Sequence, residues 1–258
     1  MRRALALFNA AMLVFMLAPL VMIVLMSFTP SGGFVLPGWH WSLRWYRAAF
    51  AYPGFVDAFL LSVRLALSAA AIATVLGFAA VWVLQRRLVP GGGWFDSLFM
   101  SPLLVPAVVF GIAMLQFLNR HGLYNSFVGV MLAHVVVVLP FVVRVIASAL
   151  RDVPRRLEWA AMGLGAGPLM TLLRVTLPLS ARGVIAGFLF AFIVSFDEVT
   201  VTLFITGPAY QTLPVRLYNY LTDQVDPTAA AVSAMLIFLS LSLIVVLDRL
   251  GGFKAMRR

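Results

Sequence analysis

Two adjacent carboxylates, Asp197 and Glu198, lie within an apolar stretch of the chain that is long enough to cross a lipid bilayer. The stretch covers residues 181–205 and is centred near Ile193. A carboxylate at the centre of a bilayer costs about 2.5–3.5 kcal/mol on insertion scales, so an acid kept there is a functional hypothesis by default. At a rise of about 1.5 Å per residue, the pair lies roughly 6–7 Å from the centre, a depth that suits the wall of a substrate path.

The two acids are expected to have different roles. Neighbouring positions on a helix differ by about 100°, so the carboxylates cannot point the same way. One then lines the path, while the other pairs with an arginine such as Arg64 or faces a partner subunit. The alternative is that both acids are used in pairing between helices. The sequence leaves open which of Asp197 and Glu198 faces the path.

The composition shows that lipid is the solvent for most of the chain. Of its 258 residues, 63% are hydrophobic and 11% charged, and the mean hydropathy is +1.02. About 20 apolar residues form a helix that spans a bilayer, and unbroken apolar runs favour helices over a barrel. The sequence therefore predicts an all-α membrane protein in one domain, residues 1–258. The six predicted transmembrane helices are residues 4–28, 58–84, 94–118, 127–149, 181–205 and 228–247.

The basic residues predict the orientation of these helices. With the N-terminus in the cytoplasm, thirteen basic residues lie on the inner side and four on the outer side, Arg44, Arg47, Arg120 and Arg216. Positive residues concentrate on the cytoplasmic side, so both termini are predicted to be cytoplasmic. The inner residues are Arg2, Arg3, Arg86, Arg87, Arg151, Arg155, Arg156, Arg174, Arg182, Arg249, Lys254, Arg257 and Arg258. Because these are scattered between spans, the net charge of +10 does not indicate nucleic-acid binding.

Aromatic residues mark the first outer loop. Trp39, Trp41, Trp45 and Tyr46 follow the first apolar segment, which is interpreted as an uncleaved span. Trp and Tyr are enriched at the membrane interface, so all four are expected at headgroup level.

A helix-coded inner loop covers residues 150–178. Asp152 is expected to cap a helix whose first turn contains Pro154. Gly163 and Gly165 are expected to stop this helix, and Gly165 is expected to have a positive φ. Pro168 then begins a second short helix that should end before Pro178. Two short helices joined at glycine form a compact knob with a small alanine surface.

Several kinds of chemistry are absent from the sequence. The chain has no cysteine, and its single lysine, Lys254, is not part of a phosphate-binding Gly-Lys-Ser/Thr loop. No zinc-protease or serine-hydrolase motif occurs, so the chain is not expected to be an enzyme or to bind a metal or cofactor. Of the three histidines, His40, His121 and His134, the last lies within a span and is interpreted as an interhelical hydrogen-bonding residue in preference to a proton relay.

The inner loop resembles the cytoplasmic loop by which permeases of binding-protein-dependent ABC importers engage their ATPase. The family pattern is Glu-Ala-Ala, three residues, Gly, nine residues, an aliphatic residue, one more, then Leu-Pro. The matching residues are Ala160, Ala161, Gly165, Val175, Leu177 and Pro178. Trp159 stands where the family usually has its Glu, and Glu158 comes one residue early. The resemblance implies that Glu158, Trp159, Ala160, Ala161, Gly165 and Pro178 couple the chain to an ATPase.

A second resemblance concerns the cargo. The sequence Ser-Phe-Asp-Glu-Val-Thr-Val at residues 195–201, Phe-Ile-Thr-Gly-Pro at residues 204–208 and Leu-Pro at residues 213–214 resembles the second permease subunit of spermidine/putrescine importers. Polyamines are multivalent cations, so carboxylates of Asp197 and Glu198 and aromatic faces of Phe196 and Tyr210 are the expected path residues. Permeases for another solute, such as an aminophosphonate, an amino-acid derivative or thiamine, share part of this pattern. A stand-alone channel or secondary transporter is a further alternative, but it gives no reason for the inner loop.

The resemblance also implies the architecture and the partners. It implies a type I ABC importer permease fold in the bacterial inner membrane. A second, different permease subunit, two ATPase subunits that hold ATP and Mg²⁺, and a periplasmic or extracellular solute-binding protein are the expected partners.

Overall fold

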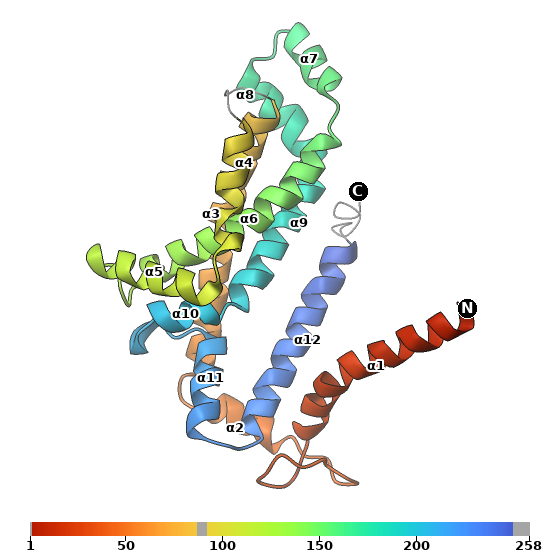
Figure 1. The fold of residues 1–258 in the computed structure, drawn as a ribbon, viewed down its shortest axis with the longest axis vertical. Coiled ribbons are helices and arrows are strands. Elements are labelled where there is room, and N and C mark those ends of the chain that lie inside the picture. Colours follow the sequence, from red (N-terminus) through yellow and green to blue (C-terminus); the bar gives the residue numbers. More distant parts are fainter. Residues whose placement is uncertain (1, 87–91, 250–258) are drawn as a thin grey trace. The chain divides into compact units, whose positions relative to one another are not determined.

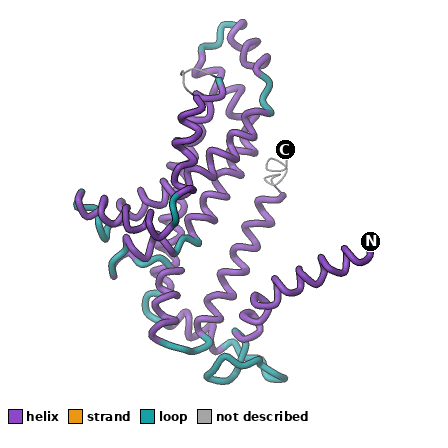
Figure 2. The backbone as a smooth tube through the Cα atoms, viewed as in Figure 1, coloured by secondary structure: helices purple, strands orange, loops and turns teal. Residues whose placement is uncertain are grey.

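The computed structural model describes residues 2–86 and 92–249. Within these residues the regular elements are all helices, joined by loops and turns, with no strand (Figures 1 and 2). The predicted inner residues Arg87, Lys254, Arg257 and Arg258 lie outside the described residues. The chain contacts divide the structure into two compact units. Each unit is described below by itself.

Unit 1 contains residues 2–59 and 215–242. Its elements are α1 (Arg2–Met26), α2 (Arg44–Ala51), the beginning of α3 (Phe55–Gln85), most of α11 (Leu213–Asp223) and most of α12 (Thr228–Arg249).

Two aromatic residues in the first turn of α2 hydrogen-bond to residues that follow directly after α1. The buried indole of Trp45 donates to the carbonyl of Thr29 at 2.9 Å, and the hydroxyls of Tyr46 and Ser27 are 2.7 Å apart. Trp45 is therefore packed inside the fold, and the position of the four aromatic residues at headgroup level stays a prediction. Trp39, in contrast, is 97% exposed.

Three aromatic rings join α11 to the start of α3 in unit 1. Tyr220 packs edge-on against Tyr52, with ring centroids 4.9 Å apart, and against Phe55 at 5.3 Å. Its hydroxyl donates to the Asp226 carboxylate at 2.9 Å. Burial raises the pKa of Tyr220, so this hydroxyl stays protonated at neutral pH and remains a donor.

Unit 2 contains residues 60–214 and 243–249 of the described chain. Besides the rest of α3, its elements are α4 (Gly92–Met100), η1 (Ser101–Leu104), α5 (Ala107–Arg120), α6 (Phe127–Arg151), α7 (Arg155–Gly163), α8 (Pro168–Thr171), the π-helix η2 (Leu172–Thr176), α9 (Leu177–Phe196), α10 (Thr200–Ile205) and η3 (Pro208–Tyr210). Within this unit, α7 and α8 lie at one end and α5 and α10 at the other (Figure 1).

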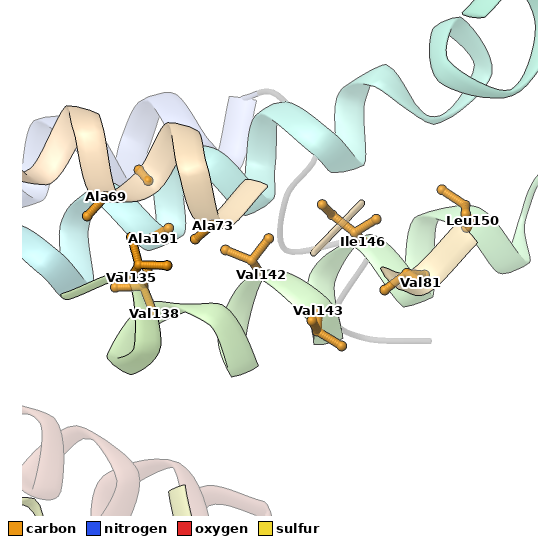
Figure 3. Packing of buried hydrophobic residues seen from close by; sticks show 11 residues of the cluster. Ala69, Ala73, Val81, Val135, Val138, Val142, Val143, Ile146, Leu150 and Ala191 are labelled. Carbon is orange, nitrogen blue, oxygen red and sulfur yellow. The ribbon is translucent and has the colours of Figure 1, made fainter. Parts of the chain in front are cut away.

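The core of unit 2 is formed by α3, α6 and α9, which pack through small and β-branched residues (Figure 3). Helices in lipid associate through close van der Waals packing, which small residues permit. A Cβ added at Gly183 on α9 would collide with Ala149 on α6, and one added at Gly77 on α3 would lie 2.8 Å from a Val142 methyl group. Glycine at these positions therefore sets how closely the helices approach.

Five helices in the described residues are long and apolar enough to cross a membrane, and a sixth span results if the bent pair α4/η1 and α5 is counted as one. The five are residues 5–26, 55–85, 127–151, 168–196 and 228–249. They coincide with five of the six predicted spans, although one of these ends early.

Two predicted spans are not continuous helices. The segment predicted at residues 94–118 bends by 107° between η1 and α5. Pro106 is the cause, because a residue before proline is driven out of the helical region, and Val105 is extended at φ −91°, ψ 129°. The span predicted at residues 181–205 begins earlier and ends at Phe196, and α10 starts only at Thr200. The two acids thus lie at an interruption and not inside a helix.

Candidate functional site

The first candidate site is the loop of residues 150–178 at one end of unit 2. The prediction that Asp152 caps its first helix is wrong. Asp152 has helical backbone angles and closes α6, with its N–H donating to Leu150. An N-cap needs an extended backbone. Pro154 supplies it at φ −67°, ψ 125°, so α7 begins at Arg155 without a side-chain cap.

The predicted glycine stop at the end of α7 is confirmed. Gly165 has φ +91°, in the left-handed region that favours glycine. The N–H of Gly165 donates to Met162, and the N–H of Ala166 donates to Ala161 at 3.0 Å. These are the two hydrogen bonds of a Schellman motif, which satisfies the last carbonyls of the helix.

The second short helix does not end before Pro178, contrary to the prediction. Pro168 begins α8, which passes through the π-turn η2 directly into α9. Proline has no N–H and would leave a gap in an α-helical ladder. In the π-turn, the N–H of Leu177 reaches back five residues to Leu172, so the chain widens just before Pro178 and stays helical.

A buried carboxylate joins three parts of this loop region. Glu158 on α7 is 6% exposed. Its Oε1 accepts from Arg86 Nη2 at 2.7 Å, just beyond the end of α3, and from Thr176 Oγ1 at 2.6 Å in η2. The ion pair lines a cavity of about 230 Å³ beneath α7 and α8. Glu158 therefore holds the loop onto its own chain, and its carboxylate is not presented to a partner.

The loop exposes several large apolar side chains. Trp159 is 62% exposed and Leu164 is 90% exposed. Ala160 and Pro178 are exposed as well, and Ala161 is half-buried. On a surface that faces water, large apolar side chains gathered together mark a site of interaction with a protein or a membrane. The exposed large apolar residues of the loop are Leu157, Trp159, Met162, Leu164, Leu169, Met170 and Leu173.

The second candidate site is the interruption between α9 and α10. Glu198 Oε1 accepts the backbone N–H of Val201 at 2.8 Å, so this carboxylate caps the first turn of α10. Asp197 closes α9 through its backbone, whereas its side chain is exposed and hydrogen-bonds to no other described residue. Neither acid pairs with Arg64 within the described chain. The two carboxylates are thus distinct, one committed to the backbone and one available.

The two aromatic residues predicted to line the path, Phe196 and Tyr210, differ in their exposure. Phe196 is 5% exposed and stacks on Phe192, with ring centroids 5.8 Å apart. Tyr210 is half-buried at the end of η3. Of the two, only Tyr210 presents part of its ring on the surface of this chain.

His134 hydrogen-bonds across this interruption, as predicted for an interhelical residue. Its Nδ1 lies 2.8 Å from Ser195 Oγ on α9, and its Nε2 lies 3.0 Å from Thr202 Oγ1 on α10. Ser195 and Thr202 were not predicted as partners of His134, and Arg86 and Thr176 were not predicted as partners of Glu158. These partners lie far from His134 and Glu158 along the chain, so no local sequence pattern indicates the contacts.

No group of three or more His, Asp or Glu side chains in the described residues could hold a metal ion.

Comparison with known proteins places the chain among transport proteins. Residues 89–253 match the family described as binding-protein-dependent transport system inner membrane component. The spermidine/putrescine transport system permease protein PotC of Haemophilus influenzae is 31% identical over 242 residues, 92% of this chain and 93% of that protein. The putrescine transport system permease protein PotI of Escherichia coli is 33% identical over 231 residues, 86% and 82% of the two chains.

A solved structure shows the same fold. The inward-facing MetNI methionine ABC transporter contains a chain that matches with a TM-score of 0.63 at 18% identity, over 78% of this chain and 95% of that one. The expected type I importer permease fold is therefore confirmed.

Proposed function

Because this chain belongs to the family of binding-protein-dependent transport system inner membrane components, we propose that it forms half of the path of an ATP-driven importer for polyamines. The family is one of multi-pass inner membrane proteins, and its members are transport subunits that act with a separate ATPase. We take residues 1–258 as one permease domain. The names of the similar polyamine permeases support this cargo, and the geometry of the interruption supports it independently.

The observation that carries the proposal is the exposed carboxylate of Asp197, which has no partner among the described residues. An acid kept in an apolar protein without an internal partner is costly and points to a ligand of opposite charge. Polyamines are flexible cations whose ammonium groups gain Coulomb energy beside a carboxylate. Glu198 supports the site by fixing the start of α10, and the exposed part of the Tyr210 ring is available for a cation–π contact.

The loop of residues 150–178 is the proposed docking element for the ATPase. Its outer surface combines exposed Trp159 and Leu164 with the small side chain of Ala160. Glu158 acts from inside the loop, because its carboxylate binds Arg86 and Thr176. The excess of basic residues on this side supports a cytoplasmic position for the loop and for both termini, in a bacterial inner membrane.

The proposed complex contains four kinds of subunit. This chain pairs with a second permease of different sequence, and two ATPase subunits bind ATP and Mg²⁺ on the cytoplasmic side. A solute-binding protein delivers cargo from the periplasmic or extracellular side.

Uptake by the reconstituted complex tests the cargo. Asp197→Asn removes the available charge at nearly constant shape and is expected to reduce putrescine and spermidine uptake at least tenfold, which corresponds to about 1.4 kcal/mol. Glu198→Gln is the matched control, because its amide oxygen can still cap Val201, and uptake should stay within about threefold of the wild type. Equal uptake by wild type and Asp197→Asn would refute the polyamine site and direct the search to uncharged or zwitterionic solutes.

A further inference from the structure

The break between α9 and α10 leaves the backbone around Asp197 without a continuous helix to hold it. α9 ends at Phe196 and α10 begins at Thr200. Asp197 has no side-chain partner among the described residues, so the direction of its carboxylate depends on how the two helix ends are fixed. One buried residue from a third helix hydrogen-bonds on both sides of the break, and this residue is His134 on α6.

The single hydrogen of the Thr202 hydroxyl sets the direction of the hydrogen bonds in this bridge. The hydroxyl of Thr202 donates its single hydrogen to the carbonyl of Glu198 at 3.0 Å. Thr202 Oγ1 must therefore accept from His134 Nε2–H, at 3.0 Å. A neutral imidazole that donates from Nε2 accepts at Nδ1, so the Ser195 hydroxyl donates to His134 at 2.8 Å.

The result is one directed chain that runs from Ser195 through His134 and Thr202 to the Glu198 carbonyl. It links the last turn of α9, the core helix α6 and the backbone of the break itself. His134 is fully buried, and each donated hydrogen in this series of hydrogen bonds has one acceptor. A fully satisfied buried network of this kind makes a structure rigid, whereas a partly satisfied one is unfavourable.

We propose that His134 is a positioning residue that acts as a clamp across the break and holds Asp197 in the orientation that meets the cargo. The part of this inference that concerns cargo rests on the proposed function. The part that concerns the position of Asp197 rests on the hydrogen bonds alone, and the two can be tested separately.

The absence of cysteine from the chain allows a direct test of position. Asp197→Cys introduces the only thiol of this chain, and its rate of modification by a cationic methanethiosulfonate reagent reports how residue 197 is presented. The rate is measured in the purified complex, on this chain separated by gel electrophoresis. His134→Phe keeps a flat ring but removes both hydrogen bonds, and it is expected to change the rate at least fivefold.

Four further variants separate the clamp from general damage. His134→Gln keeps one donor and one acceptor and should return the labelling rate to within about twofold of the parent. Thr202→Val should reproduce the effect of His134→Phe, and Thr202→Ser should not. His121→Phe is the matched control, because this histidine follows α5 and its ring contacts only Phe117 among the interactions of the described structure, through the carbonyl and the aromatic ring.

Uptake of putrescine and spermidine then tests the consequence for cargo at saturating binding protein. His134→Phe is expected to lower uptake about tenfold, and the double variant with Asp197→Asn should be no lower than Asp197→Asn alone, within about twofold. A general structural defect would instead multiply the two losses.

Each outcome decides one part of the inference. An unchanged labelling rate in His134→Phe overturns the clamp, whatever the cargo is. A changed rate together with multiplied uptake losses overturns its link to cargo. A changed rate together with normal uptake in both His134→Phe and Asp197→Asn supports the clamp but refutes the proposed polyamine site.

Discussion

The ion pair between Arg86 and Glu158 is expected to stabilise α7 against local opening. The side chains are 11% and 9% exposed, and Glu158 also accepts from Thr176 at 2.6 Å. Removing one partner of a buried ion pair costs about 3–5 kcal/mol, because the other charge is left without compensation. Since 1.4 kcal/mol corresponds to about tenfold, Glu158→Ala should favour local opening of α7 by roughly 100-fold or more.

Amide hydrogen exchange of peptides from α7 measures this opening, because exchange reports local unfolding free energies. The permease is purified in lipid nanodiscs, and exchange over residues 155–163 is compared between variants. Arg86→Met and Glu158→Ala should each accelerate exchange by the factor above. The double variant Arg86→Met/Glu158→Met leaves no uncompensated charge, so its exchange should return to within about tenfold of the wild type.

Arg156→Met is the matched control for this experiment. Arg156 is on the same helix, is exposed, and forms no ion pair with another described residue. Surface changes of this kind usually alter stability by less than about 0.5 kcal/mol, so exchange should stay within about threefold. If Glu158→Ala exchanged no faster than Arg156→Met, the reasoning that this ion pair holds the loop would be refuted.

Two further predictions concern the loop and the helix core. Gly165→Val places a branched residue at φ +91°, a strain of about 1–3 kcal/mol. Gly165→Val and Ala161→Glu, as separate single variants, should each yield an inserted permease that no longer retains the ATPase on co-purification. Gly167→Ala, at φ −67°, should retain it. Retention of the ATPase by all three variants would refute the coupling role of the loop. Gly183→Ala would bring two methyl groups into collision and should lower the thermal stability of the purified complex, and adding Ala149→Gly should restore it. A double variant no more stable than Gly183→Ala would show that this contact does not limit helix approach.

Local chemistry was sufficient to predict several features from the sequence. Apolar runs of about 20 residues predicted the spans, because in lipid only a helix satisfies every backbone group within one segment. Gly165 could be placed as a helix stop, because the left-handed conformation after a helix depends on few atoms beyond the residue itself. The spaced motif around Ala160 and Pro178 predicted the family, which comparison then confirmed.

Other features depended on residues that the chain brings together from a distance. Glu198 caps the first turn of α10, which leaves Asp197 as the carboxylate that is free to meet a ligand. This cap exists only because α9 ends at Phe196, and the apolar pattern of residues 181–205 did not predict that end. Glu158 looked like a residue for a partner and is instead buried against Arg86, 72 positions away.

The difference between the features predicted from the sequence and those seen only in the structure has a physical reason. Hydrophobicity and backbone conformation act over one or two turns, so the sequence alone determined the membrane class, most spans and the glycine stop. A buried polar group needs a partner, and the partner is chosen by tertiary packing. Only the folded structure could show that His134 joins Ser195 to Thr202, and that Glu158 joins Arg86 to Thr176, because these partners are distant in sequence and adjacent in space.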